Sequence, residues 1–169
     1  MMGIISCKTR ALFETCKTAC QSFGFHAAPD DCYLALRGLR TMGVRLRHHE
    51  KSGIHIANWL KTRPEVDKVL HPALPDCPGH ENWKKQFQGA SGLFSFTLRD
   101  GYSKNALAAM LDGMDIFGMG ASWGGYESLL IPAHPDQYRT AVPWPAGKLL
   151  LRTHIGLEDV EDLKTDLAE

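Results

Sequence analysis

Short strand patterns, mixed with helical patterns, constrain the fold of this chain more than any other feature. Residues 92–98 alternate in polarity, so Phe94, Phe96 and Leu98 share one face of a predicted strand. The strands and helices follow no strict strand–helix–strand rhythm, which predicts an α+β fold with helices on one face of a mainly antiparallel sheet. The other predicted strands are residues 1–7, 66–70, 116–119, 128–131 and 148–152.

Helical periodicity predicts several helices, one of them unusually long. Residues 9–22 place Leu12, Phe13 and Cys16 on one helical face, and Gly24 ends that helix. A mostly helical pattern then runs from residue 31 to 63, where Pro64 stops it. The proline-rich residues 71–79 predict a loop, and the remaining predicted helices are residues 80–86, 104–112 and 157–167.

The composition is that of a globular protein without a dominant charge. Of the 169 residues, 44% are hydrophobic and 22% are charged, which is enough for a buried core. Nineteen basic residues balance nineteen acidic ones, which disfavours a nucleic-acid or acidic-membrane partner. There is no signal-peptide pattern or membrane-length apolar stretch, and the five irregularly spaced cysteines indicate a reduced compartment. These features predict a cytoplasmic location.

Three short motifs match known catalytic or metal sites only in part. Gly118-Met-Gly120 lacks the third glycine of a dinucleotide loop, because Trp stands there instead. His49-Glu50 lacks the second histidine of a zinc-protease helix. Residues 120–124 read Gly-Ala-Ser-Trp-Gly, as in a nucleophile elbow, but they lack the strand-to-helix context and the His and acid partners of that motif. The sequence therefore predicts no metal site and no catalytic residue, and three histidines are expected on a helix surface: His48, His49 and His55.

A glycine-rich segment and a late arginine are the candidate binding residues. Ser122 and Trp123 precede two glycines, so backbone amides, a hydroxyl and an indole wall can approach a ligand closely. Arg152 ends an apolar strand and offers the two parallel hydrogen bonds that a carboxylate accepts. The alternative for the first segment is a turn with one packed Trp. The alternative for the arginine is an internal salt bridge with Glu127 or Asp159.

Six collinear segments carry a family resemblance. Residues 119–128 read MGASWGGYES and residues 149–159 read LLLRTHIGLED. Together with four others, they resemble the transsulfuration enzymes, the pyridoxal-phosphate family of cysteine and methionine metabolism. Within that family they are most similar to the C-terminal part of the carbon–sulfur β-lyases, and the similarity covers the whole chain. The four other segments are residues 37–47, 71–75, 79–83 and 91–96.

The resemblance implies a fold and a division of the chain. The fold would be the C-terminal small domain of a fold-type I pyridoxal-phosphate enzyme, with a remnant strand and helix of the large domain. Residues 1–38 would be the large-domain remnant with the connecting helix, and residues 39–169 the small domain. The family is homotetrameric, which implies association with further subunits.

The resemblance also implies a substrate and roles for three residues. Arg152 matches the arginine that binds the substrate α-carboxylate, and Ser122 and Trp123 match the pair that lines the same pocket. The implied reaction cleaves cystathionine to homocysteine, pyruvate and ammonia in methionine biosynthesis. Pyridoxal phosphate serves as the electron sink for this chemistry.

The lysine that anchors the family's cofactor has no counterpart in this sequence. We therefore expect no lyase activity from the chain alone. Lys61 and Lys164 are expected on solvated helix faces, where nothing lowers an amine pKa for Schiff-base chemistry. Two alternatives remain: a non-catalytic subunit that binds another chain, for which an unpaired first strand offers an edge, and an amino-acid carboxylate-binding module.

Overall fold

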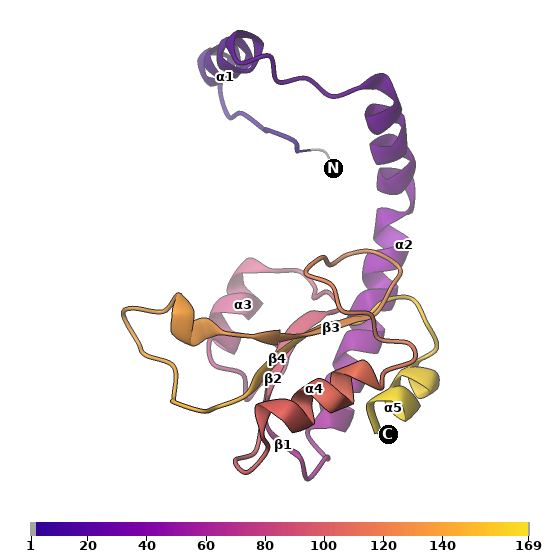
Figure 1. Cartoon of the computed structure of the whole chain (residues 1–169). Helices are drawn as coiled ribbons and strands as arrows, with labels where there is room; N and C mark the ends of the chain where they lie inside the picture. The colour runs from indigo at the N-terminus through magenta and orange to yellow at the C-terminus, as the bar shows by residue number, and fades with distance from the viewer. Residues whose placement is uncertain (1–2, 169) are drawn as a thin grey trace. The chain divides into compact units, whose positions relative to one another are not determined.

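The structure, a computed structural model, describes residues 3–168 and divides into two compact units (Figure 1). The first unit is Met1–Gly43 and the second is Val44–Glu169. The long helix α2 (Pro29–Leu60) contributes residues to both units. No helix among residues 3–168 is long and apolar enough to cross a bilayer.

The first unit is helical and has no buried side chain between residues 3 and 43. Helix α1 (Arg10–Ser22) begins after Thr9, whose hydroxyl accepts a hydrogen bond from the Leu12 amide at 3.3 Å. The predicted strand at 1–7 is wrong for residues 3–7, which are irregular; Met1 and Met2 lie outside the described residues. A strand needs a hydrogen-bonded neighbour, and no strand among the described residues pairs with this segment.

The second unit contains a four-stranded sheet in the order β1-β2-β4-β3, and every neighbouring pair is antiparallel. The predicted α+β class and the antiparallel sheet are confirmed. The strands are β1 (Val66–Leu70), β2 (Leu93–Leu98), β3 (Leu129–Ala133) and β4 (Leu150–His154). The helices after α2 are α3 (His80–Gln86), α4 (Lys104–Asp112) and α5 (Val160–Ala168), with a short 3-10 turn at Pro135–Gln137.

One face of the sheet forms the core of this unit. Phe94 and Phe96 of β2 project to this face with Leu151 of β4, and all three are at most 4% exposed. Figure 1 shows α4, α5 and the C-terminal part of α2 against the sheet. The helix residues that complete the core are Ile56, Ala57 and Leu60 of α2, Leu107 and Leu111 of α4, and Leu163 of α5.

Several predicted boundaries shift by a few residues, and one predicted strand is wrong. Helix α2 begins at Pro29, two residues earlier than predicted, because proline suits the first helical turn. Residues 116–119 form no strand; Gly118 makes one isolated bridge to Leu129. The amides of the residues before Gly118 bond to the Asp166 side chain instead, so they are unavailable for a ladder.

Candidate functional site

Arg152 lies on the face of the sheet opposite the core. Alternation along β4 turns Leu151 and Thr153 toward the core, so Arg152 and His154 point to the other face. The cross-strand neighbours of Arg152 are Ser95 on β2 and Ile131 on β3. The apolar strand therefore places the Arg152 guanidinium on the face of the sheet opposite the core.

The loop of residues 115–128 brings the other two predicted site residues to Arg152. One guanidinium nitrogen, Nη2, donates to the Ser122 carbonyl at 3.0 Å and to the Gly120 carbonyl at 3.4 Å. The Arg152 guanidinium lies 5.6 Å from the centre of the Trp123 ring, within cation–π range. Trp123 is 60% exposed, so its indole is an open wall beside the charge.

The Arg152 guanidinium retains an unused donor. Its Nε is buried and has no hydrogen-bond partner among the described residues. Among the described residues, Arg152 forms no ion pair with Glu127 or Asp159, the two partners that the sequence left open. A buried donor without an acceptor is costly, and a carboxylate is the acceptor that fits a guanidinium edge best.

Two carboxylates fix the ends of the loop at residues 115–128. At its start, the buried Asp166 of α5 accepts hydrogen bonds from three successive amides, those of residues 115–117, at 2.7 to 3.0 Å. At its end, Glu158 accepts bonds from the amide and hydroxyl of Ser128, both at 2.8 Å. The Ser128 hydroxyl in turn accepts the Gly156 amide at 2.8 Å. Side chains from one C-terminal segment therefore hold this irregular loop in place.

Gly156 makes a close approach between this loop and the end of β4 possible. A Cβ at Gly156 would overlap the Tyr126 carbonyl, and the neighbouring Leu157 amide donates to that carbonyl at 2.8 Å. Glycine is the residue that allows such backbone contact. Gly156 lies within the segment LLLRTHIGLED, but no role was predicted for it from the sequence.

The middle of the loop is held by a histidine that the sequence analysis did not single out. His154, only 2% exposed, accepts the Gly124 amide at its Nε2, at 3.1 Å. His49 of α2 packs beside it, with ring centres 5.0 Å apart, and its Nδ1 lies 2.8 Å from the Ile155 carbonyl. The expected surface position is therefore wrong for His49, which is 1% exposed, whereas His48 and His55 are exposed. Period-two alternation from Arg152 could have placed His154 at the site.

Three lysines with described partners do not fit a cofactor anchor. Lys61 pairs with Asp76 at 2.7 Å, and Lys164 pairs with Glu161 at 2.8 Å. Only 17% of the Lys164 side chain is exposed, so the expected solvated position is wrong for it. Hydrogen bonding to Asp67 raises the pKa of Lys148, the reverse of what Schiff-base chemistry needs. No group of three or more metal-ligating side chains occurs between residues 3 and 168.

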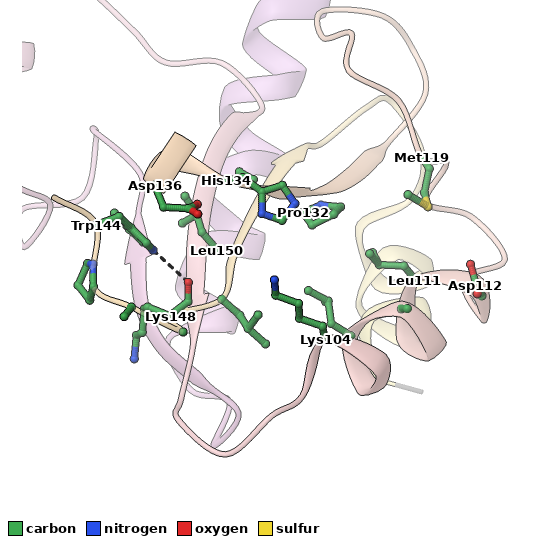
Figure 2. A pocket seen from close by; sticks show the side chains of 17 residues that line it. Lys104, Leu111, Asp112, Met119, Pro132, His134, Asp136, Trp144, Lys148 and Leu150 are labelled. Atoms are coloured by element: carbon green, nitrogen blue, oxygen red, sulfur yellow. Dashed lines mark hydrogen bonds between the residues drawn. The ribbon is translucent and has the colours of Figure 1, made fainter. Parts of the chain in front are cut away.

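A separate cavity of about 400 Å³ lies between α4 and the connection from β3 to β4. Figure 2 shows Lys104, His134 and Asp136 around it, with Leu111 and Leu150 among its apolar walls. None of the three predicted site residues lines it. The cavity and the Arg152 region are therefore distinct features of the second unit.

Comparison with known proteins places this arrangement in a family. The model of the family described as Cys/Met metabolism PLP-dependent enzyme matches residues 1–169. The cystathionine beta-lyase of Escherichia coli strain K12 is 44% identical over 99% of this chain and 43% of its own length. An L-alanine/L-glutamate racemase of Wolbachia pipientis is 43% identical over 92% of this chain and 39% of its own length.

Solved structures give the same result. A cystathionine gamma synthase from Xanthomonas oryzae, in complex with cystathionine, superposes with a TM-score of 0.81 and 34% identity. The match covers 95% of this chain and 42% of that enzyme. This chain thus corresponds to the C-terminal part of longer fold-type I enzymes and spans about two fifths of their length. The chain belongs to the Cys/Met metabolism family of pyridoxal-phosphate-dependent enzymes.

Proposed function

We propose that this chain is the C-terminal portion of a cystathionine β-lyase and binds the substrate α-carboxylate through Arg152, Ser122 and Trp123. The observation that carries the proposal is the buried Arg152 Nε, which has no acceptor among the described residues, beside the exposed Trp123 indole. The similar proteins include a lyase, a synthase and a racemase, whose names contain the amino acids cystathionine, alanine or glutamate. An α-carboxylate is common to all of these amino acids.

The proposed binding mode follows from how Arg152 is held. Because its Nη2 already donates to the Gly120 and Ser122 carbonyls, the guanidinium plane is fixed before a ligand arrives. Its remaining donors can form the paired hydrogen bonds that a carboxylate accepts. The indole of Trp123 lies within cation–π range of the guanidinium and forms an open apolar wall beside it.

The bond-breaking steps of the lyase reaction require a cofactor and its lysine anchor. We assign these groups to the part of the longer relatives that this chain does not match. In this family, pyridoxal phosphate supplies an electron sink for bond cleavage at the amino acid. The lysines with described partners do not fit its anchor, so the proposal includes no lyase activity for the chain alone. It also includes residues 1–38 as a large-domain remnant, residues 39–169 as the small domain, and a cytoplasmic location, in keeping with five free cysteines.

Isothermal titration of L-cystathionine tests the binding proposal. Replacing Arg152 by Ala removes the charged hydrogen bonds and should weaken affinity at least about tenfold. Arg99→Ala, which removes an exposed arginine elsewhere on the second unit, should leave affinity unchanged. Equal affinity of the wild-type and Arg152→Ala chains would remove the basis of the proposal.

An activity assay tests the second part. The purified chain, mixed with pyridoxal phosphate and cystathionine, should release no pyruvate above a cofactor-only blank. Pyruvate release together with a visible absorption band from lysine-bound cofactor would show that the chain is an enzyme by itself.

Association with another polypeptide is a second candidate function, favoured by the first unit. Its large apolar side chains are exposed, including Ile4 at 85%, Phe23 at 74% and Phe25 at 71%. Phe23 and Phe25 stack with ring centres 5.7 Å apart, and an exposed apolar patch is typical of a surface that binds another protein. We propose that these side chains, rather than a strand edge, make the subunit contacts of a family-type tetramer. Phe23→Ser combined with Phe25→Ser should convert any oligomer seen by analytical ultracentrifugation to monomer, and an unchanged sedimentation coefficient would exclude this surface.

A further inference from the structure

The turn beside Trp123 depends on two side chains for its position. His154 accepts the Gly124 amide at 3.1 Å, and Arg45 of α2 donates to the Gly124 carbonyl at 3.1 Å. Gly124 has a φ of +80°, a left-handed conformation that glycine adopts without strain. Among the described residues no strand pairing supports this peptide, so these bonds, together with those from Arg152 to the Gly120 and Ser122 carbonyls, hold Trp123 beside Arg152.

The hydrogen bonds also determine the proton positions on the two buried histidines. Because His154 Nε2 accepts an amide, the neutral His154 ring carries its proton on Nδ1. The His49 Nδ1 lies against the Ile155 carbonyl, so it must be a donor, and its Nε2 is the free acceptor. Both remaining atoms, His154 Nδ1 and His49 Nε2, are buried without a partner among the described residues. The pair therefore fits two neutral rings.

We infer that neutral His154 is a positioning residue for the carboxylate site, and that protonation of its ring releases the turn that carries Trp123. A proton on Nε2 removes the acceptor of the Gly124 amide. It leaves Nε2 facing the Gly125 carbonyl, 3.4 Å away, so the hydrogen-bond direction at the turn reverses. The inference rests on the proposed function, since it concerns the same site.

The groups around His154 favour its neutral form at neutral pH. Burial is the main cause that lowers the His154 pKa from its ordinary 6.5; the nearby Arg152 charge lowers it further, as does His49 whenever that ring carries a proton. The Gly125 carbonyl and Glu158 act in the opposite direction but do not outweigh burial. Arg45 adds another positive charge on the α2 side of the turn. The His154 ring is thus neutral above pH 6.5, and we expect the turn to be released only below this pH.

Nuclear magnetic resonance of the ¹⁵N-labelled chain tests the geometry independently of ligand binding. At about pH 8, a scalar coupling should connect the Gly124 amide nitrogen to His154 Nε2 through their hydrogen bond, and both His154 and His49 should show the Nδ1–H tautomer. The coupling should vanish as the pH is lowered below 6.5 and the His154 ring takes up its proton. Absence of the coupling at the higher pH would overturn the inference.

Cystathionine affinity tests the consequence. The ligand carboxylates stay ionised between about pH 5 and 8, so a loss of affinity over this range reports on the protein. The affinity of the wild-type chain should fall about tenfold on acidification. The pH midpoint of this fall should equal the pH midpoint at which the scalar coupling is lost. His154→Gln offers a neutral acceptor that does not titrate, and should bind with little pH dependence. His48→Gln, an exposed histidine on α2, should keep the wild-type profile.

The outcomes separate this inference from the proposed function. A flat wild-type profile, or an unchanged profile in His154→Gln, overturns the role of His154 even where Arg152→Ala weakens binding. Unchanged affinity in Arg152→Ala instead overturns the carboxylate site, whatever the coupling shows. His154→Leu, which removes the acceptor, should weaken cystathionine binding about tenfold at the higher pH. If His154→Leu fails to fold, His154→Gln still tests the role of His154.

Discussion

The two units use apolar side chains in different ways. In the second unit Phe96 is 2% exposed and lies in a core between the sheet and three helices, whereas Phe25 in the first unit is 71% exposed. The contrast runs through one helix, because every buried residue of α2 lies at or after His49. Caps and periodicity are local and suffice to predict a helix, but burial requires a facing surface. The difference teaches that the second unit holds the described core and the candidate site, whereas the first unit exposes its apolar side chains.

Truncating one phenylalanine in each unit should give the largest contrast. Phe96→Ala removes a fully buried ring from the core and should lower the free energy of unfolding by about 3–5 kcal/mol. Phe25→Ala removes an exposed ring and should change it by no more than about 0.5 kcal/mol. Urea denaturation followed by circular dichroism measures both, and similar losses would show that the first unit has a core of its own.

Removing a carboxylate that holds the loop should cost less. Asp166→Asn weakens the bonds to three amides of the loop and should destabilise the second unit by about 1–3 kcal/mol. Asp112→Asn, an exposed acid at the end of α4, is the matched control and should have little effect. Thermal melts of both variants measure the difference. Equal melting temperatures would mean that the loop is held by other contacts.

The cap of α1 should matter only locally. Thr9→Ala removes the hydroxyl that accepts the Leu12 amide and should destabilise the helix by about 1 kcal/mol. Amide exchange within Arg10–Ser22 should therefore accelerate several-fold, while exchange in β2 stays unchanged. Faster exchange in both places would break the contrast between the units.

The smallest effect concerns the Lys148–Asp67 pair of the second unit. A hydrogen bond from Lys148, at 2.8 Å, lowers the pKa of Asp67 below its ordinary 3.8. A depressed carboxyl pKa stabilises the fold above the unfolded value, and this stability is lost as pH falls through the folded value. The melting temperature of the wild type should exceed that of Asp67→Asn at neutral pH, and the gap should close in acid below that value. A gap independent of pH would exclude the ion pair as its cause.

Local signals in the sequence predicted much of the second unit. The bounds of β1, α3 and α4 agree with the predicted residues 66–70, 80–86 and 104–112. Pro64 and the proline-rich loop after β1 act within a few residues, so no tertiary contact is needed to recognise them.

The failed predictions depend on distant partners. Residues 3–7 and 116–119 are short apolar runs, and such a run forms a strand only beside a neighbour. His49 and His48 are adjacent on one helix, and only packing against His154 determines which of them is buried. Asp166 and Glu158 hold the loop from far along the chain, so spacing in the sequence gives no sign of either role.

The proposed carboxylate site could be predicted from the sequence only in its residue types. Arg152 was predicted because it ends an apolar strand, and Ser122 and Trp123 because they precede two glycines. The structure brings these three residues together. Sequence left open an internal salt bridge for Arg152. Only the three-dimensional structure shows which carbonyls accept hydrogen bonds from the Arg152 Nη2. It also shows that the Arg152 Nε has no acceptor among the described residues.

The most direct test of the carboxylate site is the Arg152 Nε–H resonance of the ¹⁵N-labelled chain during a titration. Addition of L-cystathionine should move this signal downfield and saturate, because the carboxylate supplies the missing acceptor. A thioether diamine of the same length without carboxylates should leave it in place. An identical response to both ligands, or no response to cystathionine, would contradict a carboxylate-binding role for this arginine.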